Sequence, residues 1–238
     1  MKKKIKSLIS RANKGDPKSL HELAFEYWEG KNLEQDFSKA LKLWKLSASK
    51  GFAKACFNLG AMYFNGNGVP VNYKKSYYYL NLSIKKRHTA LSTSYFFLGN
   101  KFYLDGKNGK KNIKKGIKYL EIAAKKNCIR SQFLLASYYD DEEEKIYSIK
   151  KDNTKAFKYY KMTADNKFLP GLIIIGMLYA DGKGVKKNMN KAYKYINLGK
   201  SIDGGKLIDE LPFFPEDKIR LKKMMEIYQD KLRKIETK

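Results

Sequence analysis

The sequence predicts an all-α fold in which about five helix-turn-helix units stack as a solenoid. In the first helix of each unit, a large aliphatic residue precedes a small one, and an aromatic residue follows three positions later. The pairs are Leu23-Ala24, Leu59-Gly60, Leu98-Gly99, Leu135-Ala136 and Ile175-Gly176, and the aromatic residues are Tyr27, Tyr63, Phe102, Tyr139 and Tyr179. In the second helix, a small residue precedes a large apolar one by four positions: Ala40 and Trp44, Ser76 and Leu80, Gly116 and Leu120, Ala156 and Tyr160, Ala192 and Ile196. Successive small residues are 36 or 40 positions apart, a period typical of helical repeats.

The second unit, residues 52–86, indicates how each helix pair forms. Gly66-Asn67-Gly68-Val69-Pro70 interrupts the first helix, because glycine and proline favour turns. Asn72 is a suitable N-cap for the second helix, as Asp36 is in the first unit. We expect small residues such as Gly60 to lie where the two helices of a unit approach most closely, with larger side chains filling the space on either side.

The best-matching units carry a longer motif. In the second unit it consists of Leu59-Gly60, Tyr63, Gly66, Gly68-Val69 and Lys75-Ser76, and in the fifth of Ile175-Gly176, Tyr179, Gly182, Gly184-Val185 and Lys191-Ala192. This pattern resembles the Sel1-like repeat family, which is related to tetratricopeptide repeats, over about residues 16–200. The third unit departs from it because Asp105-Gly106 comes one residue late, and the fourth has an acidic insertion at 140–144. The resemblance implies a right-handed α-solenoid that acts as a protein-interaction scaffold.

These patterns divide the chain into three regions. Residues 1–15 form a basic lead-in, 16–202 form the repeat array, and 203–238 contain a C-terminal amphipathic helix. The five repeats are expected at about 16–51, 52–88, 89–127, 128–167 and 168–202. The C-terminal helix has an apolar stripe with helical spacing, formed by Leu221, Met225, Tyr228, Leu232 and Ile235. We expect it to cap the exposed edge of the last repeat, as solenoids require, or alternatively to occupy the concave groove.

A formal net charge of +26 favours anionic partners such as nucleic acid, an anionic membrane surface or acidic proteins. Only five of the 50 basic residues are arginines, although arginine is the usual choice for reading bases and clamping phosphates. A solvated lysine surface therefore remains the simpler interpretation. One basic ridge is expected where a lysine precedes the small residue of each second helix, at Lys39, Lys75, Lys115, Lys155 and Lys191. The resemblance places the second helices on the convex side.

The sequence contains no recognisable catalytic or metal-binding arrangement. His21 and His88, the only histidines, fall in different units and lack a neighbouring nucleophile with a carboxylate partner. Cys56 and Cys128 also fall in different units, which favours buried thiols in a reducing compartment. There is no convincing signal peptide and no apolar run of membrane-spanning length. We therefore expect a cytoplasmic, non-enzymatic protein with no cofactor, no metal and no small-molecule substrate. An enzyme remains the weakest alternative, since some disulfide-rich family members have been linked to β-lactams.

The expected partner-binding surface is the concave face, which the resemblance assigns to the first helices. Two columns flank the small residue of each first helix by two positions: Glu22, Asn58, Phe97, Leu134 and Ile174 before it, and Glu26, Met62, Lys101, Tyr138 and Leu178 after it. The columns change from polar to apolar along the chain, which suits a peptide with an apolar anchor. The favoured function is an adaptor that binds a segment of a protein partner of unknown identity in this groove. The alternative is a polyanion-associated protein that acts through its lysine ridges.

Overall fold

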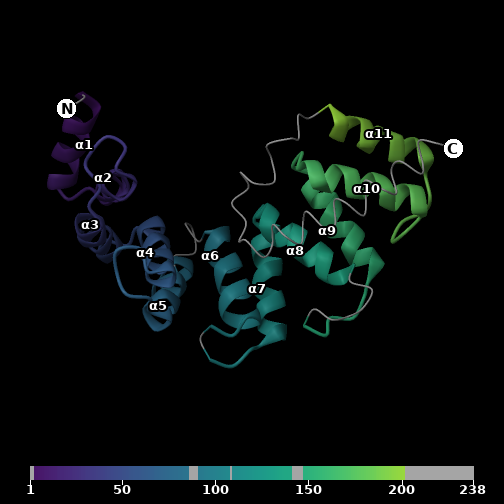
Figure 1. The fold of residues 1–238 in the computed structure, drawn as a ribbon, viewed down its shortest axis with the longest axis horizontal. Helices are drawn as coiled ribbons and strands as arrows, with labels where there is room; N and C mark the ends of the chain where they lie inside the picture. Colours follow the sequence, from purple (N-terminus) through teal and green to yellow (C-terminus); the bar gives the residue numbers. More distant parts are fainter. Residues whose placement is uncertain (1–2, 86–90, 108, 141–146, 202–238) are drawn as a thin grey trace. The chain divides into compact units, whose positions relative to one another are not determined.

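The computed structural model describes residues 3–85, 91–107, 109–140 and 147–201, and every regular element in this part of the chain is a helix (Figure 1). Its elements are α1 (Lys3–Asn13), α2 (Pro17–Glu29), α3 (Phe37–Ser49), α4 (Ala53–Asn65), α5 (Tyr73–Lys85), α6 (Ser92–Phe97), the π-helical segment η2 (Leu98–Leu104), α7 (Ile113–Lys125), α8 (Ile129–Tyr139), α9 (Asn153–Asp165), α10 (Leu169–Asp181) and α11 (Met189–Lys200). The predicted all-α repeat fold is confirmed. Residues 203–238, where a C-terminal helix is predicted, lie outside the described residues.

The chain divides into two compact units, residues 1–122 and 123–238. In the first unit, α2 packs against α3, α4 packs against α5, and α3 joins these two hairpins by packing on α4 (Figure 1). The lead-in segment forms α1, which buries Ile5, Leu8 and Ala12 against Leu20 and Leu23 of α2. An apolar helix face thereby covers the open side of the first hairpin.

The second unit repeats the same arrangement. Helix α8 packs against α9, α10 packs against α11, and α9 joins the two hairpins by packing on α10. Phe133 of α8 makes edge-on ring contacts with Tyr160 of α9 and with Phe168, which directly precedes α10. Aromatic side chains therefore fill the space between successive helices within this unit.

Each hairpin of the array is built around a crossing of small residues. A Cβ atom added at Gly60 would lie 2.7 Å from Cγ of Leu80, and one added at Gly176 would lie 2.7 Å from Cγ1 of Ile196. At Gly99, an added Cβ would lie 3.0 Å from the carbonyl oxygen of Gly116 in the facing helix. All the predicted small residues and their large apolar neighbours are buried, which confirms the close-approach prediction.

Among the described residues, the third hairpin contains the one helical segment that departs from regular α-helix. Residues Leu98–Leu104 form η2, where a π-helical turn takes up an additional residue. The sequence spacing indicates the same extra residue, because seven positions separate Gly99 from Gly106 and six separate Gly60 from Gly66. The π-helix therefore keeps the small-residue crossing and the following turn in register.

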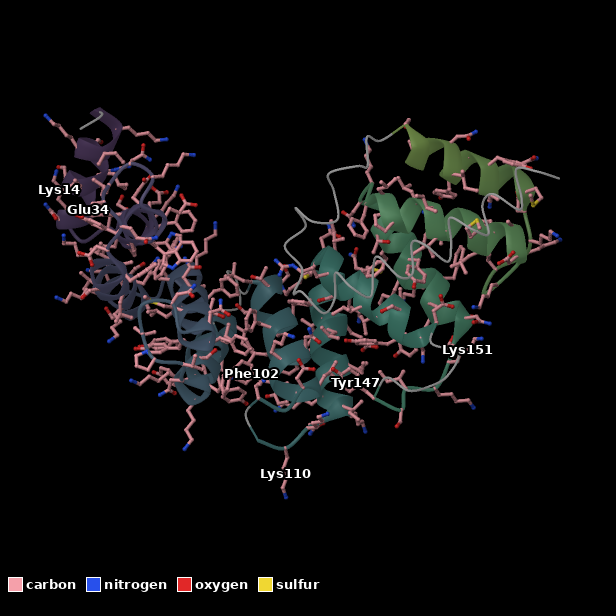
Figure 2. The ribbon with its side chains drawn as sticks, in the orientation of Figure 1. Lys14, Glu34, Phe102, Lys110, Tyr147 and Lys151 are labelled. Atoms are coloured by element: carbon pink, nitrogen blue, oxygen red, sulfur yellow. The ribbon has the colours of Figure 1, made fainter. Side chains whose placement is uncertain are left out.

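This extra residue changes one predicted column. In four hairpins, the N-cap residue of the second helix donates its backbone N–H to the carbonyl of the predicted aromatic residue: Tyr27, Tyr63, Tyr139 and Tyr179. In the third hairpin, the N–H of Asn112 donates to Tyr103 at 2.8 Å. The prediction that Phe102 occupies this column is therefore wrong. Phe102 instead points from η2 toward α4 and α5, where it contacts the rings of Phe64 and Tyr77 (Figure 2).

The crossing at Gly60 generates a stability prediction. We expect Gly60→Leu to lower the free energy of unfolding by about 1–3 kcal/mol, because the added side chain overpacks the contact with Leu80. Equilibrium urea unfolding followed by circular dichroism measures this change. Lys54→Leu, at an exposed position of the same helix, is the control and should have little effect. Equal stability of the two variants would contradict the close-approach model.

Candidate functional site

The predicted basic ridge is part of a local structure that repeats five times. In each hairpin, the ridge lysine donates its backbone N–H to the N-cap side chain three positions earlier, at 2.8 to 2.9 Å. Its ammonium group lies 4.5 to 5.3 Å from the ring centroid of the first-helix tyrosine. We call this arrangement the lysine–tyrosine clasp. Its five members are Lys39–Tyr27, Lys75–Tyr63, Lys115–Tyr103, Lys155–Tyr139 and Lys191–Tyr179.

Two of the clasps also contain an ion pair. Asp36 and Asp152 lie 3.2 Å from the ammonium groups of Lys39 and Lys155. The backbone N–H of the lysine holds the pKa of each carboxyl below its usual value, and Asp36 raises the pKa of Lys39. The ridge lysines are exposed, but each interacts with its own hairpin. This geometry gives the lysine ridge a structural role without requiring an anionic partner.

The ten predicted groove residues fall into two classes. Seven of them are buried: Met62, Phe97, Lys101, Leu134, Tyr138, Ile174 and Leu178. The other three, Glu22, Glu26 and Asn58, are partly exposed. In this conformation the buried seven pack in the protein interior, as when Phe97 makes edge-on ring contacts with Phe57 and Phe64. Partner binding at the ten positions stays a prediction, and the exposed three belong to the first unit.

Two adjoining hollows lie at these exposed positions. The first, which we call the α2–α4 hollow, has a volume of about 250 Å³. It is lined by Phe25, Trp28, Trp44, Phe57, Asn58, Ala61, Met62, Asn65 and Asn67. The second, the α1–α2 hollow, has a volume of about 450 Å³ and is lined by Lys4, Ile5, Leu8, Arg11, His21, Glu22, Phe25 and Glu26. Phe25 lines both hollows and is 39% exposed.

Aromatic contacts hold the shared wall of these hollows in place. Phe25 and Trp28, one turn apart on α2, stack with ring centroids 5.9 Å apart. Trp28 also contacts Trp44 of α3, with centroids 6.4 Å apart, and Trp44 is only 2% exposed. A buried tryptophan thus anchors the two aromatic residues that lie nearer the surface. The repeat pattern does not single out Phe25 and Trp28, although two aromatic residues one turn apart on a first helix are a usable signal.

His21 is a residue of α2 that contacts α4 and the residue before it. Its Nε2 atom is 3.1 Å from the side-chain nitrogen of Asn58, and its ring contacts Phe52 with centroids 5.1 Å apart. Burial, together with a smaller effect of the positive charge of Lys54, lowers the pKa of His21 to about 4. The imidazole is therefore neutral at physiological pH and accepts a hydrogen bond from the Asn58 amide. This arrangement is suited to fixing the helix contact and not to proton transfer near neutral pH.

The described part of the chain contains no group of three or more potential metal ligands. No helix among these residues is long and apolar enough to cross a membrane. The α2–α4 hollow is smaller than most small-molecule sites, which measure about 300–1,000 Å³. Its apolar walls and rim of asparagine amides are more suitable for a single side chain of a larger partner.

A model of the Sel1 repeat family matches five segments of the chain, residues 17–52, 53–88, 92–128, 129–168 and 171–199. These segments correspond to the five hairpins, including the third one with its π-helical segment. No curated protein matches the chain at a significant level.

Several solved structures have a similar fold. The protective antigen c5321 of uropathogenic Escherichia coli, described as displaying an SLR fold, has 23% identity and a TM-score of 0.70, over 82% of this chain and 40% of its own. A Sel1 repeat protein from Oxalobacter formigenes has 23% identity and a TM-score of 0.69, over 82% of this chain and 77% of its own. The immunity protein PA5088 of Pseudomonas aeruginosa has 18% identity and a TM-score of 0.53, over 87% and 78%. At these identities the likeness shows the fold alone, and this chain spans less than half of the E. coli protein.

The clasp generates a prediction that a double-mutant cycle can test. Lys75 and Tyr63 are a suitable pair, because the N-cap Asn72 is uncharged and adds no ion pair. We expect Lys75→Met and Tyr63→Leu to show a coupling energy of about 0.5–1 kcal/mol in urea unfolding. Lys74→Met, at the adjacent exposed position, should show no coupling to Tyr63→Leu. Equal coupling for the two lysines would argue against a specific clasp.

The lowered pKa of His21 predicts how stability changes with pH. His21 protonates at about 4 in the folded protein and near 6.5 when unfolded, so the unfolded state binds more protons between these values. Stability from this group is fully present above pH 6.5 and is lost as pH falls toward 4. His21→Asn should therefore show a smaller loss of stability over this window than the wild type. Because the chain has two histidines, this variant also assigns the His21 NMR signal. A titration midpoint near pH 6.5 for that signal in the folded protein would contradict the burial argument.

Proposed function

Because the chain belongs to the Sel1 repeat family, we propose that it is a non-enzymatic scaffold that binds a partner protein at the α2–α4 hollow. Sel1 repeats generally mediate protein–protein interactions, and proteins built from them are generally scaffolds and not enzymes. The observation that carries the proposal is the exposed aromatic wall of α2. Phe25 is 39% exposed and is held in place through Trp28 by the buried Trp44.

This wall has the features of a binding hot spot. Aromatic residues that are fixed in position lose little conformational entropy when a partner covers them, so most of the buried apolar area contributes to affinity. The hollow combines this apolar wall with three amides at Asn58, Asn65 and Asn67, which can both donate and accept hydrogen bonds. The main chain of a bound segment needs both kinds of partner.

The site coincides with the N-terminal end of the predicted groove columns. Glu22, Glu26 and Asn58 border the two hollows and remain partly exposed. The proposal is therefore narrower than the sequence prediction, since it needs only the first two hairpins. We also propose a cytoplasmic location, which is supported by the two buried, free thiols of Cys56 and Cys128.

A capture experiment tests the proposed surface. The tagged full-length chain is incubated with lysate of its own cells at about 150 mM salt, with and without nuclease. We expect nuclease-resistant protein partners to be retained by the wild type and lost with Phe25→Ser, because the aromatic wall supplies the contact area.

Tyr78→Ser is the matched control, since Tyr78 is an aromatic residue on α5 that is 61% exposed and lies outside both hollows. It should leave capture unchanged. Capture that survives Phe25→Ser would overturn the assignment to the α2–α4 hollow. Loss of all captured protein after nuclease treatment would instead favour the polyanion alternative.

A further inference from the structure

The charge of α2 differs from that of the rest of the protein. Residues 16–36, which contain α2 and the following turn, include six acidic residues but only two lysines. The acidic residues are Asp16, Glu22, Glu26, Glu29, Glu34 and Asp36. The whole chain, by contrast, has a net charge of +26. The segment that carries the exposed aromatic wall is therefore acidic in its own sequence.

The carboxylates next to the wall are available to a partner. The carboxylate of Glu22 is 3.9 Å from the Lys18 ammonium, which is a loose and exposed pair. Glu26 accepts a hydrogen bond from the side chain of Asn32 at 2.7 Å. Both residues line the α1–α2 hollow on either side of Phe25. Lys18, the only lysine of α2, therefore does not fully neutralise Glu22 and Glu26.

Positive groups also face this region and must be counted. Lys4 and Arg11 of α1 line the same hollow, and Lys54 of α4 is near His21. Among the described residues, neither Lys4 nor Arg11 forms an ion pair with Glu22 or Glu26, and the positive charge of Arg11 acts on Asp16. On α2 itself, the charged residues closest in sequence to Phe25 are therefore the two carboxylates Glu22 and Glu26.

From these observations we propose that the α2–α4 hollow binds a peptide segment with one large apolar side chain flanked by lysine or arginine residues. The apolar side chain enters the hollow against Phe25 and Trp28, whose aromatic faces it covers. The flanking cations lie beside Glu22 and Glu26, one turn before and immediately after Phe25 on α2. The inference rests on the proposed function and adds the chemical class of the partner.

The two tryptophans make a direct test possible. Trp28 and Trp44 are the only tryptophans of the chain, and both line the α2–α4 hollow. Binding of a peptide without Trp or Tyr therefore changes a fluorescence signal that originates at the site. The probe is a capped peptide of about twelve residues with a central leucine flanked by lysines, titrated into the full-length protein. The matched control peptide has glutamate in place of every lysine.

We expect the lysine peptide to bind and the glutamate peptide to bind at least tenfold more weakly. Glu22→Gln with Glu26→Gln should weaken the lysine peptide about two- to tenfold, the range for two exposed ion pairs. Glu34→Gln removes one carboxylate from the turn after α2. Glu34 lines neither hollow, so this variant should have no effect. A leucine-to-alanine peptide should lose affinity for the wild type.

Two results would overturn the proposal. One is equal affinity of the wild type for the lysine and glutamate peptides. The other is an equal response of the Glu22/Glu26 variant and the Glu34→Gln control. If Phe25→Ser still abolishes lysate capture in that case, the proposed function stands and only the partner chemistry is wrong. If capture is independent of Phe25, the proposed function itself fails, whichever peptide binds.

Discussion

The close approach of two helices at a side-chain-free crossing is the constraint on which each hairpin depends. Where Gly60 faces Leu80, even one added carbon would lie within 2.7 Å of the neighbouring side chain. This crossing fixes the separation of the two helices, and therefore the distance between their other facing side chains. The lysine–tyrosine clasp and the stacked pair Tyr63–Tyr79, with ring planes 3° apart, both require that fixed separation. Packing at the crossing thus comes first, and the polar contacts follow from it.

The clasp explains why a lysine is tolerated where helix electrostatics disfavour it. Lys39 is the third residue of α3, and the positive end of the helix dipole lies at that terminus. The tyrosine ring presents its negative face to the ammonium, and the Asp36 carboxylate lies beside it in the first hairpin. The same local compensation recurs in every hairpin. A column of lysines is therefore weak evidence for a polyanion partner, because the fold itself stabilises the lysines there.

Periodicity predicted the parts of the fold that repeat, and it failed where one hairpin breaks the period. Residues such as Leu59 and Leu80 recur at constant spacing because every hairpin has the same crossing, so the columns could be read directly. The third hairpin has an extra residue, and the hydrogen bond from Asn112 and the clasp with Lys115 show that Tyr103 replaces Phe102 in its column. The groove was harder to predict, because the spacing identifies a helix face but not its burial. Met62 follows the expected column and yet is 2% exposed.

Net charge and local charge lead to different expectations for partners. At physiological salt, charges beyond about 8 Å are largely screened, so a partner docked on α2 responds mainly to the carboxylates next to it. The lysines of the other hairpins act at longer range and affect the approach of a partner more than its final contacts. Glu22 and Glu26 flank Phe25 on the surface of α2, so apolar contact and charge attraction coincide at one place. This coincidence, and not the total of +26, is the feature on which the proposed partner selection at the hollow depends.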